Sequence, residues 1–259
     1  MRIAFVVDPL PSLKAYKDTS IALMRAAQAA GHAVWVVQQS AIHWSALHGV
    51  CAEAVHLEML ADDDEWFVEV DRHVVALRDF AAVLMRKDPP FDTEYVTSTW
   101  LLERAEAEGA RVLNRPRALR DHSEKLAVAE FPQFAVPGVV ARVPALIHAF
   151  IDLERDTIVK PLDGMGGTGV FRVRRDDPNR NVIVETLTHN GARTVIAQRY
   201  IPEIDDGDKR ILIVGGEVVP YCLARIPKPG ETRGNLAVGG RGVARELSAR
   251  DRQIATTLA

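Results

Sequence analysis

Thr157-Ile-Val-Lys-Pro-Leu-Asp-Gly-Met-Gly-Gly-Thr-Gly-Val-Phe-Arg-Val-Arg174 is the stretch that decides the fold of this chain. It reads as a strand, a glycine-rich loop and a second strand, with Lys160 just before the loop. Four glycines within six residues remove Cβ atoms where a backbone must approach a ligand closely. Backbone N–H groups exposed in such a turn form an anion site, and the neighbouring lysine suggests that the anion is phosphate. We therefore predict a nucleotide-binding hairpin.

The loop matches Gly-x-Gly-x-x-Gly, a pattern that several nucleotide-binding folds share. A dinucleotide-binding fold needs a helix after this motif, whereas residues 170–174 alternate apolar and basic side chains as a strand does. No Gly-Lys-Ser/Thr closes the loop, which excludes a P-loop. Protein kinases carry their lysine on the following strand, and the chain lacks His-Arg-Asp and Asp-Phe-Gly. An ordinary tight hairpin remains the alternative, although two glycines would suffice for one.

Bulk composition narrows the class of partner and the compartment. A length of 259 residues leaves room for more than one domain, and a net charge of −3 creates no field that would attract nucleic acid or an anionic membrane. Cys51 and Cys222 are the only cysteines, so no disulfide framework is implied. No apolar run approaches the ~20 residues of a membrane span. We expect a cytoplasmic protein that binds neither nucleic acid nor membrane.

The first 120 residues predict an α/β domain with a parallel sheet. A strand over 2–7, a helix over 21–30 and a strand over 33–37 complete a βαβ unit. Asp18 to Ser20 would cap that helix. The pattern further indicates a strand near 54–57, one at 81–85, a helix from Asp92 to Gly109, a strand at 111–113, a helix start at Asp62–Glu65, and core positions for Trp35 and Trp100.

The rest of the chain predicts two smaller subdomains, at 121–202 and 203–259. The first holds the glycine-rich hairpin. In the second, strands over 209–214 and 217–225 are joined by Gly215-Gly216, a two-residue turn typical of hairpins. Further elements are expected as a helix entry at 121–124, a strand at 135–140, a helix at 145–153, a strand at 194–200 and a helix from Ala249.

Residues 226–242 lack apolar periodicity and are rich in glycine and cations. Long loops without regular structure in a compact chain are often functional lids. We expect a lid that closes over an anion, with a merely flexible loop as the alternative.

Longer motifs connect these features to a known family. Lys160–Gly167, Asp206–Arg210, Pro220–Pro227 and Glu231–Ala237 resemble bacterial glutathione synthetase, of the ATP-grasp superfamily, and so does Met85–Asp92. The resemblance runs from Met1 to Ala259. It implies an N-terminal parallel-sheet pre-ATP-grasp domain followed by an ATP-grasp fold that is incomplete at its C-terminal end. It also implies that ATP, through an acyl phosphate, drives the joining of γ-glutamylcysteine to glycine, with release of ADP and phosphate.

The resemblance assigns candidate roles to single residues. Lys125 and Lys160 would hold the ATP phosphates, and the backbone of the glycine-rich loop would cover them. Arg210 and Arg225 would reach the transferred phosphoryl group, where an arginine fork fits best, and with Lys160 they are the catalytic candidates. The full set expected to bind ATP is Lys125, Lys160, Gly164, Met165, Gly166, Gly167, Gln198, Tyr200, Ile201, Asp208, Lys209 and Arg210.

Substrate-binding candidates lie in the first domain and in the lid. Arg86 follows the strand at 81–85, at a strand end where open sheets bind ligands, and we assign it to a carboxylate of the peptide. Ser20 could assist, or serve only as a helix cap. In the lid, Arg233, Asn235 and Arg241 would close on substrate, while Arg225 would contact it from the second subdomain. Solvated surface positions remain the alternative for each of these cations.

The chain departs from the family pattern at its end. The family continues with Glu-x-Asn, which holds Mg²⁺ (or Mn²⁺) between the phosphates, and nothing after the lid supplies that pair here. We expect the metal ligands beyond Ala259, and a truncated piece that is itself inactive. Family members tend to be tetramers, so a homo-oligomer is implied. Two alternatives stay open. One is another ATP-grasp carboxylate–amine ligase, such as a D-alanine–D-alanine ligase, and the other is a non-catalytic nucleotide- or peptide-binding module.

Overall fold

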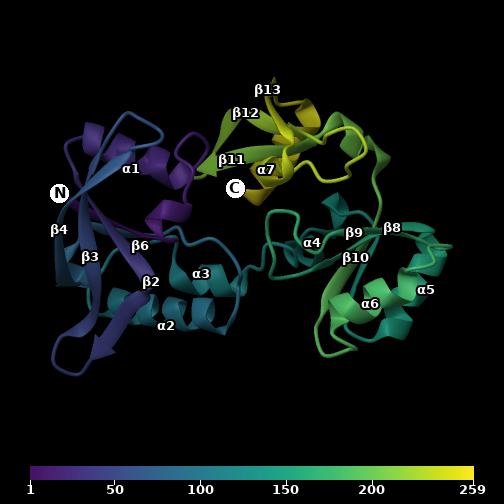
Figure 1. Ribbon diagram of the computed structural model, residues 1–259, viewed down its shortest axis with the longest axis horizontal. Helices are drawn as coiled ribbons and strands as arrows, with labels where there is room; N and C mark the ends of the chain where they lie inside the picture. The colour runs from purple at the N-terminus through teal and green to yellow at the C-terminus, as the bar shows by residue number, and fades with distance from the viewer. The chain divides into compact units, whose positions relative to one another are not determined.

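A six-stranded mixed sheet forms the centre of the first of two units, Met1–Ser123, in a computed structural model that describes residues 1–259 apart from the side chain at position 237 (Figure 1). The strand order is β4-β3-β2-β1-β5-β6. Strands β2, β1, β5 and β6 run parallel, which confirms the predicted parallel sheet, and β3 and β4 extend it in antiparallel fashion. The strands are β1 (Arg2–Val7), β2 (Ala33–Ser45), β3 (Gly49–Met59), β4 (Phe67–Ala76), β5 (Ala82–Met85) and β6 (Val112–Leu113).

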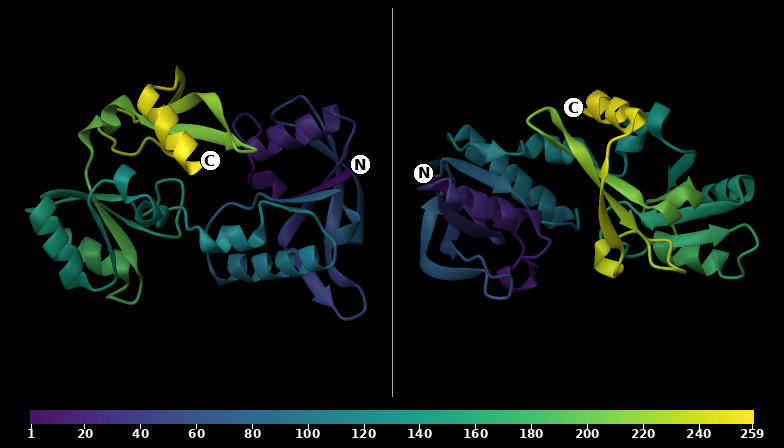
Figure 2. Two further views of the ribbon diagram at one scale, coloured as in Figure 1. Left: turned by 180° about the vertical axis from the view of Figure 1, so that it is seen from behind. Right: turned by 90° about the horizontal axis from the view of Figure 1, so that it is seen from above.

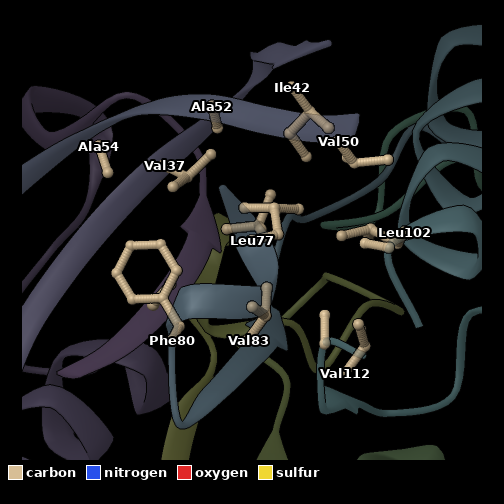
Figure 3. Packing of buried hydrophobic residues seen from close by; sticks show 14 of the residues in the cluster. Val37, Ile42, Val50, Ala52, Ala54, Leu77, Phe80, Val83, Leu102 and Val112 are labelled. Carbon is tan, nitrogen blue, oxygen red and sulfur yellow. The ribbon is translucent and has the colours of Figure 1, made fainter. Parts of the chain in front are cut away.

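Helices cover both faces of this sheet. Helix α1 (Thr19–Ala29) buries Ile21 and Met24 against one face, and α2 (Thr93–Ala107) buries Leu102 against the other. Figure 3 shows the core on the α2 side, where Val37, Ala52, Val83 and Leu102 point into one cluster. Asp18 caps α1, as the sequence predicts, and Asp92 caps α2. Helix α3 (Pro116–Asp121) packs beside α2.

Three expectations for this unit are wrong or incomplete. Asp62–Glu65 starts no helix, because the Asp62 carboxylate accepts from the N–H groups of Asp64 and Glu65 in a turn that leads to β4. Trp100 lies on the outer side of α2 and is 56% exposed, whereas Trp35 is buried. Strand β4 was not predicted, since most of its side chains face solvent and its sequence shows no buried face.

The second unit, Glu124–Ala259, contains two antiparallel sheets. The first has the order β7-β10-β8-β9 and packs helices α5 and α6 on one face (Figure 2). Its core includes Ile147, Ile151, Val159 and Val184. The elements are α4 (Ala127–Glu130), β7 (Gly138–Ala141), α5 (Pro144–Glu154), β8 (Asp156–Pro161), β9 (Phe171–Arg174), α6 (Arg180–Thr188) and β10 (Val195–Arg199).

The second sheet has the order β11-β12-β13, from β11 (Asp208–Val214), β12 (Glu217–Ile226) and β13 (Arg241–Glu246). Gly215-Gly216 joins β11 to β12, which confirms the predicted hairpin. Helix α7 (Ala249–Leu258) begins at the predicted position, is capped by Ser248 and packs on β12. The division of the chain at 202/203 stays a prediction. Within the described residues, no helix has the length and apolar character needed to cross a membrane.

Candidate nucleotide- and substrate-binding sites

The glycine-rich loop lies between β8 and β9, which pair as the predicted hairpin. Gly166, Gly167 and Gly169 have φ values of 66°, 84° and 70°, in the left-handed region that favours glycine. Lys125 reaches this loop from the start of the unit: its Nζ donates to the carbonyl of Gly164 at 2.6 Å and to that of Leu162 at 3.3 Å. The two lysines predicted to hold phosphates therefore come together at one loop.

Electrostatics at Lys160 favour an anionic ligand. Burial lowers the pKa of Lys160, and the positive charge of Lys125 lowers it further, while Glu124 opposes both effects. A buried ammonium next to a second cation is stabilised by a negative charge. A polyphosphate bound under the loop would supply that charge.

Lys160 and Gln198 share the sheet face that lies opposite the helices. In the register of β8 and β10, Lys160 pairs with Ile196 and Gln198 pairs with Ile158. Directly opposed residues point to the same side of a sheet, and the side alternates along each strand. Val159 and Ala197 accordingly point to the helix side, where both are buried. The structure thus brings these two predicted ATP-binding residues onto one surface.

Arg172, which is not among the residues predicted from the sequence, contacts the predicted ATP-binding residue Tyr200. It lies on β9, and its guanidinium lies 3.7 Å from the centroid of the Tyr200 ring. Asp156 holds it in place, accepting from Nε at 2.9 Å and from Nη2 at 2.6 Å. The carbonyl of Asp156 also accepts from the Tyr200 N–H at 3.0 Å. The basic alternation of residues 170–174 was the only sequence signal. Tyr200 is 9% exposed, while Ile201 beside it is exposed.

Asp208 and Arg225 form a bidentate ion pair across β11 and β12. Arg225 Nε donates to Asp208 Oδ1 at 2.7 Å, and Nη2 contacts Oδ2. Arg210 lies on the same face, two residues along β11, and is exposed. Lys209 points to the other face, where its Nζ lies 2.7 Å from Asp251 Oδ2 of α7. Of the four candidates on these strands, three therefore share a face and Lys209 does not.

The predicted lid contacts the glycine-rich loop. Glu231 accepts from Arg233 Nε at 3.0 Å and from Nη2 at 2.6 Å, and Arg233 Nη1 donates to the carbonyl of Gly167 at 3.1 Å. A Cβ added at Gly167 would lie 3.1 Å from Asn235 Oδ1. Arg241 is exposed at the first residue of β13 and does not take part.

Arg86 and Ser20 meet at the carboxyl edge of the first unit's sheet. Arg86 directly follows β5, and its Nε donates to Ser20 Oγ at 3.1 Å. Ser20 is 5% exposed at the start of α1. The side chain of Asp18, and not that of Ser20, caps this helix. The structure thus places the two predicted substrate-binding residues of this unit in direct contact.

A divalent metal has no ready ligand set in the part of the chain that the structure describes. No group of three or more His, Cys, Asp or Glu side chains is placed to hold a metal ion there. Asp208, the one carboxylate among the predicted ATP-binding residues, is engaged by Arg225. The described residues therefore do not fit a metal site by themselves.

Comparison with known proteins covers the whole chain. Residues 1–120 match the profile of the prokaryotic glutathione synthetase N-terminal domain, and residues 124–259 match that family's ATP-grasp domain. The glutathione synthetase of Ralstonia nicotianae is 55% identical over 259 residues, covering 100% of this chain and 80% of the relative. That of Nitrosomonas europaea is 54% identical (100% and 81% covered), and that of Pseudomonas aeruginosa 50% (98% and 80%).

Solved structures share the fold at low identity. D-cycloserine synthetase superposes with a TM-score of 0.65 at 19% identity, covering 99% of this chain and 78% of that one. An ATP-grasp protein with a RimK domain from Sphaerobacter thermophilus gives 0.58 at 21% identity, with 87% and 73% covered. The fold is therefore that of the ATP-grasp ligases. Together with the two matched domains and the identity to the relatives, this shows that the chain belongs to the prokaryotic glutathione synthetase family.

Proposed function

We propose that this enzyme, as a chain of the relatives' full length, catalyses the ATP-dependent joining of γ-glutamylcysteine to glycine, which forms glutathione and releases ADP and phosphate. The observation that carries the proposal is the convergence of Lys125 and Lys160 on the glycine-rich loop. Family membership supports an ATP-dependent ligase, and relatives at 50–55% identity named glutathione synthetase do not favour a D-alanine ligase.

The reaction requires no nucleophile from the protein. The terminal phosphoryl group of ATP passes to an oxygen of the cysteine carboxylate of the dipeptide. The carboxyl carbon of this acyl phosphate is then electrophilic. The amine of glycine then attacks the same carbon, and phosphate leaves. The protein must hold two anions together, stabilise the charge that develops and exclude water from the acyl phosphate.

Most candidate residues have a defined task in this scheme. Lys125 and Lys160 hold the phosphates under backbone groups of the glycine-rich loop. The segment Gln198–Ile201 receives the adenine. The contact between Arg172 and Tyr200 holds this segment in place. Arg210 and Arg225 contact the transferred phosphoryl group, which requires Arg225 to exchange its partner Asp208 for substrate. Asp208 is assigned to the nucleotide, and Arg233 and Asn235 to the closing of the lid. Lys209, which pairs with Asp251, and Arg241, which is exposed at the start of β13, stay predictions.

Mg²⁺ is the metal we propose to accompany ATP, with Mn²⁺ as the alternative. It would offset charge on the β- and γ-phosphates. Because the described residues do not fit a metal site by themselves, no ligand from them is assigned. We also propose a cytoplasmic homotetramer. The compartment rests on Cys51 and Cys222, which are both free thiols, and the tetramer rests on family resemblance.

Calorimetry and an ADP-release assay together test the proposal. The chain should bind ATP with magnesium, and Lys160→Gln should weaken binding at least ~10-fold, while the matched control Lys14→Gln in the first unit should not. In a chain of the relatives' full length with γ-glutamylcysteine present, glycine should stimulate ADP release and D-alanine should not. A chain that ignores ATP would overturn the function. Binding without ADP release, by a chain of the relatives' full length, would favour the non-catalytic module.

A further inference from the structure

The loop that follows β5 is a built structure at the carboxyl edge of the first unit's parallel strands. Lys87 Nζ lies 2.7 Å from Asp8 Oδ1 and donates to the carbonyl of Asp88 at 2.7 Å. The N–H of Asp88 donates to Asp8 Oδ2 at 2.9 Å. Since Asp8 directly follows β1, these bonds fix the loop to the end of the neighbouring strand. The charges of Lys87 and Asp8 are thereby used within the protein.

Arg86 keeps most of its hydrogen-bonding capacity. Its Nε donates to Ser20 Oγ, and in the part of the chain that the structure describes, no carboxylate forms an ion pair with its two terminal nitrogens. A guanidinium offers donors in a planar fork that matches a carboxylate. The fork of Arg86 is therefore available to the carboxylate of a ligand.

Asp88 provides the opposite charge next to that fork. Its carboxylate accepts no hydrogen bond from any described residue, whereas Asp18 accepts from the N–H groups of Ser20 (2.7 Å) and Ile21 (3.2 Å). Partial burial raises the pKa of Asp88, and the negative charges of Asp8 and Asp18 raise it further. The positive charges of Lys87 and Arg86 lower this pKa but do not offset the rise, so an additional cation at the Asp88 carboxylate would be favourable.

We propose that Arg86 and Asp88 form a subsite for an α-amino-acid end group, with Arg86 and Ser20 taking the carboxylate and Asp88 taking the ammonium. The inference rests on the proposed function, because the γ-glutamyl end of the dipeptide carries both charges on one carbon. It adds a specificity-determining residue, Asp88, and a requirement for a free α-amino group. Analogues with an acylated or missing amine are selected against.

Three dipeptides separate the two halves of this subsite in calorimetry with the 259-residue chain. They are γ-glutamylcysteine, glutarylcysteine, which lacks only the ammonium, and 4-aminobutanoylcysteine, which lacks only the α-carboxylate. A charge-assisted hydrogen bond is worth ~1.5–3 kcal/mol, so each deletion should weaken binding about 10- to 100-fold. Asp88→Asn should weaken the binding of γ-glutamylcysteine by the same factor and leave the affinity for glutarylcysteine within about twofold. The control Asp64→Asn, in an exposed turn, should change neither.

The outcomes distinguish the inference from the function on which it rests. If the unaltered chain binds glutarylcysteine as tightly as γ-glutamylcysteine, the ammonium subsite is overturned while dipeptide binding stands; this comparison needs no variant. Equal weakening of both ligands in Asp88→Asn would also overturn it, as the effect would then be structural. If none of the three ligands binds, the proposed function fails together with the inference.

Discussion

The guanidinium of Arg225 is paired with the carboxylate of Asp208 on the neighbouring strand, and its side chain is only 14% exposed. One of the two arginines assigned to the phosphoryl group is thus held by one of the residues assigned to the nucleotide. A ligand that binds the Arg225 guanidinium would have to compete with Asp208. Removing either partner alone leaves a partly buried charge without its counterion.

Arg225→Ala should lower turnover about 10²–10³-fold in the active enzyme, the scale of losing one preorganised charge-stabilising group. The affinity for ATP should barely change, because Lys125 and Lys160 remain. ADP release gives the rate and calorimetry gives the affinity. Glu217→Ala, at the far turn of the same hairpin, serves as the control. A rate within twofold of the unaltered enzyme would refute the assigned role.

Glu231 should titrate far below an ordinary glutamate. Hydrogen bonding by the Arg233 side chain lowers the pKa of Glu231 from 4.5 to about 2, the N–H groups of Thr232 and Arg233 contribute, and partial burial opposes them. A depressed pKa stabilises the fold fully above pH ~4.5, and this contribution is lost as the pH falls through 2. NMR titration should give about 2, and a clearly higher value in Arg233→Ala, which keeps only the two backbone N–H groups. Arg241→Ala should leave it low; an unchanged value in Arg233→Ala would contradict the assignment.

Trypsin should cut the lid of the free protein after Arg233 or Arg241, and more slowly with ATP and γ-glutamylcysteine bound. Cleavage after Arg233 needs its side chain to enter the protease, and Glu231 and Gly167 hold that side chain. Glu231→Ala should therefore speed cleavage at Arg233 severalfold and change cleavage at Arg241 much less. Mass spectrometry of the fragments measures both sites. Cutting that ignores the ligands would show that this segment does not close.

Gly167→Ala should weaken ATP binding about 10-fold, whereas Gly230→Ala should leave it within twofold. Both glycines have positive φ, 84° and 79°, so each substitution strains the backbone by ~1 kcal/mol or more. Only the Cβ at position 167 would crowd the lid, 3.0 Å from Arg233 Cδ; at 230 nothing lies within 4 Å. Calorimetry compares the affinities. Equal losses in both variants would mean that backbone strain alone is responsible.

Helices and strands with one buried face could be predicted from the sequence, and those without a buried face could not. The strand at 2–7 and the helix capped by Asp18 combine clear periodicity with clear boundaries, and both are confirmed. Strand β4 pairs with β3 although Val70 and Val74 are exposed, so its presence depends on β3 rather than on its own pattern. Trp100 shows the same limit: its helix was predictable, its outward position was not.

Site geometry depends on register, which local sequence does not fix. Counting outward from the Gly215-Gly216 turn pairs Val214 with Glu217 and would place Asp208 opposite Leu223. An irregularity between Ile211 and Ile213 shifts the register by two residues and places Asp208 opposite Arg225. A shift of two keeps every side chain on its face. The sequence could therefore predict which face Arg225 occupies, but not that Asp208 would be its partner.

The Asp251 carboxylate also serves two elements, since it caps α7 through Ser248 and receives the ammonium of Lys209. A substitution at this one acid would fray the terminal helix and release a cation on β11 at the same moment. A substitution of Asp251 in α7 would thus also alter β11, which lies about forty residues earlier in the chain.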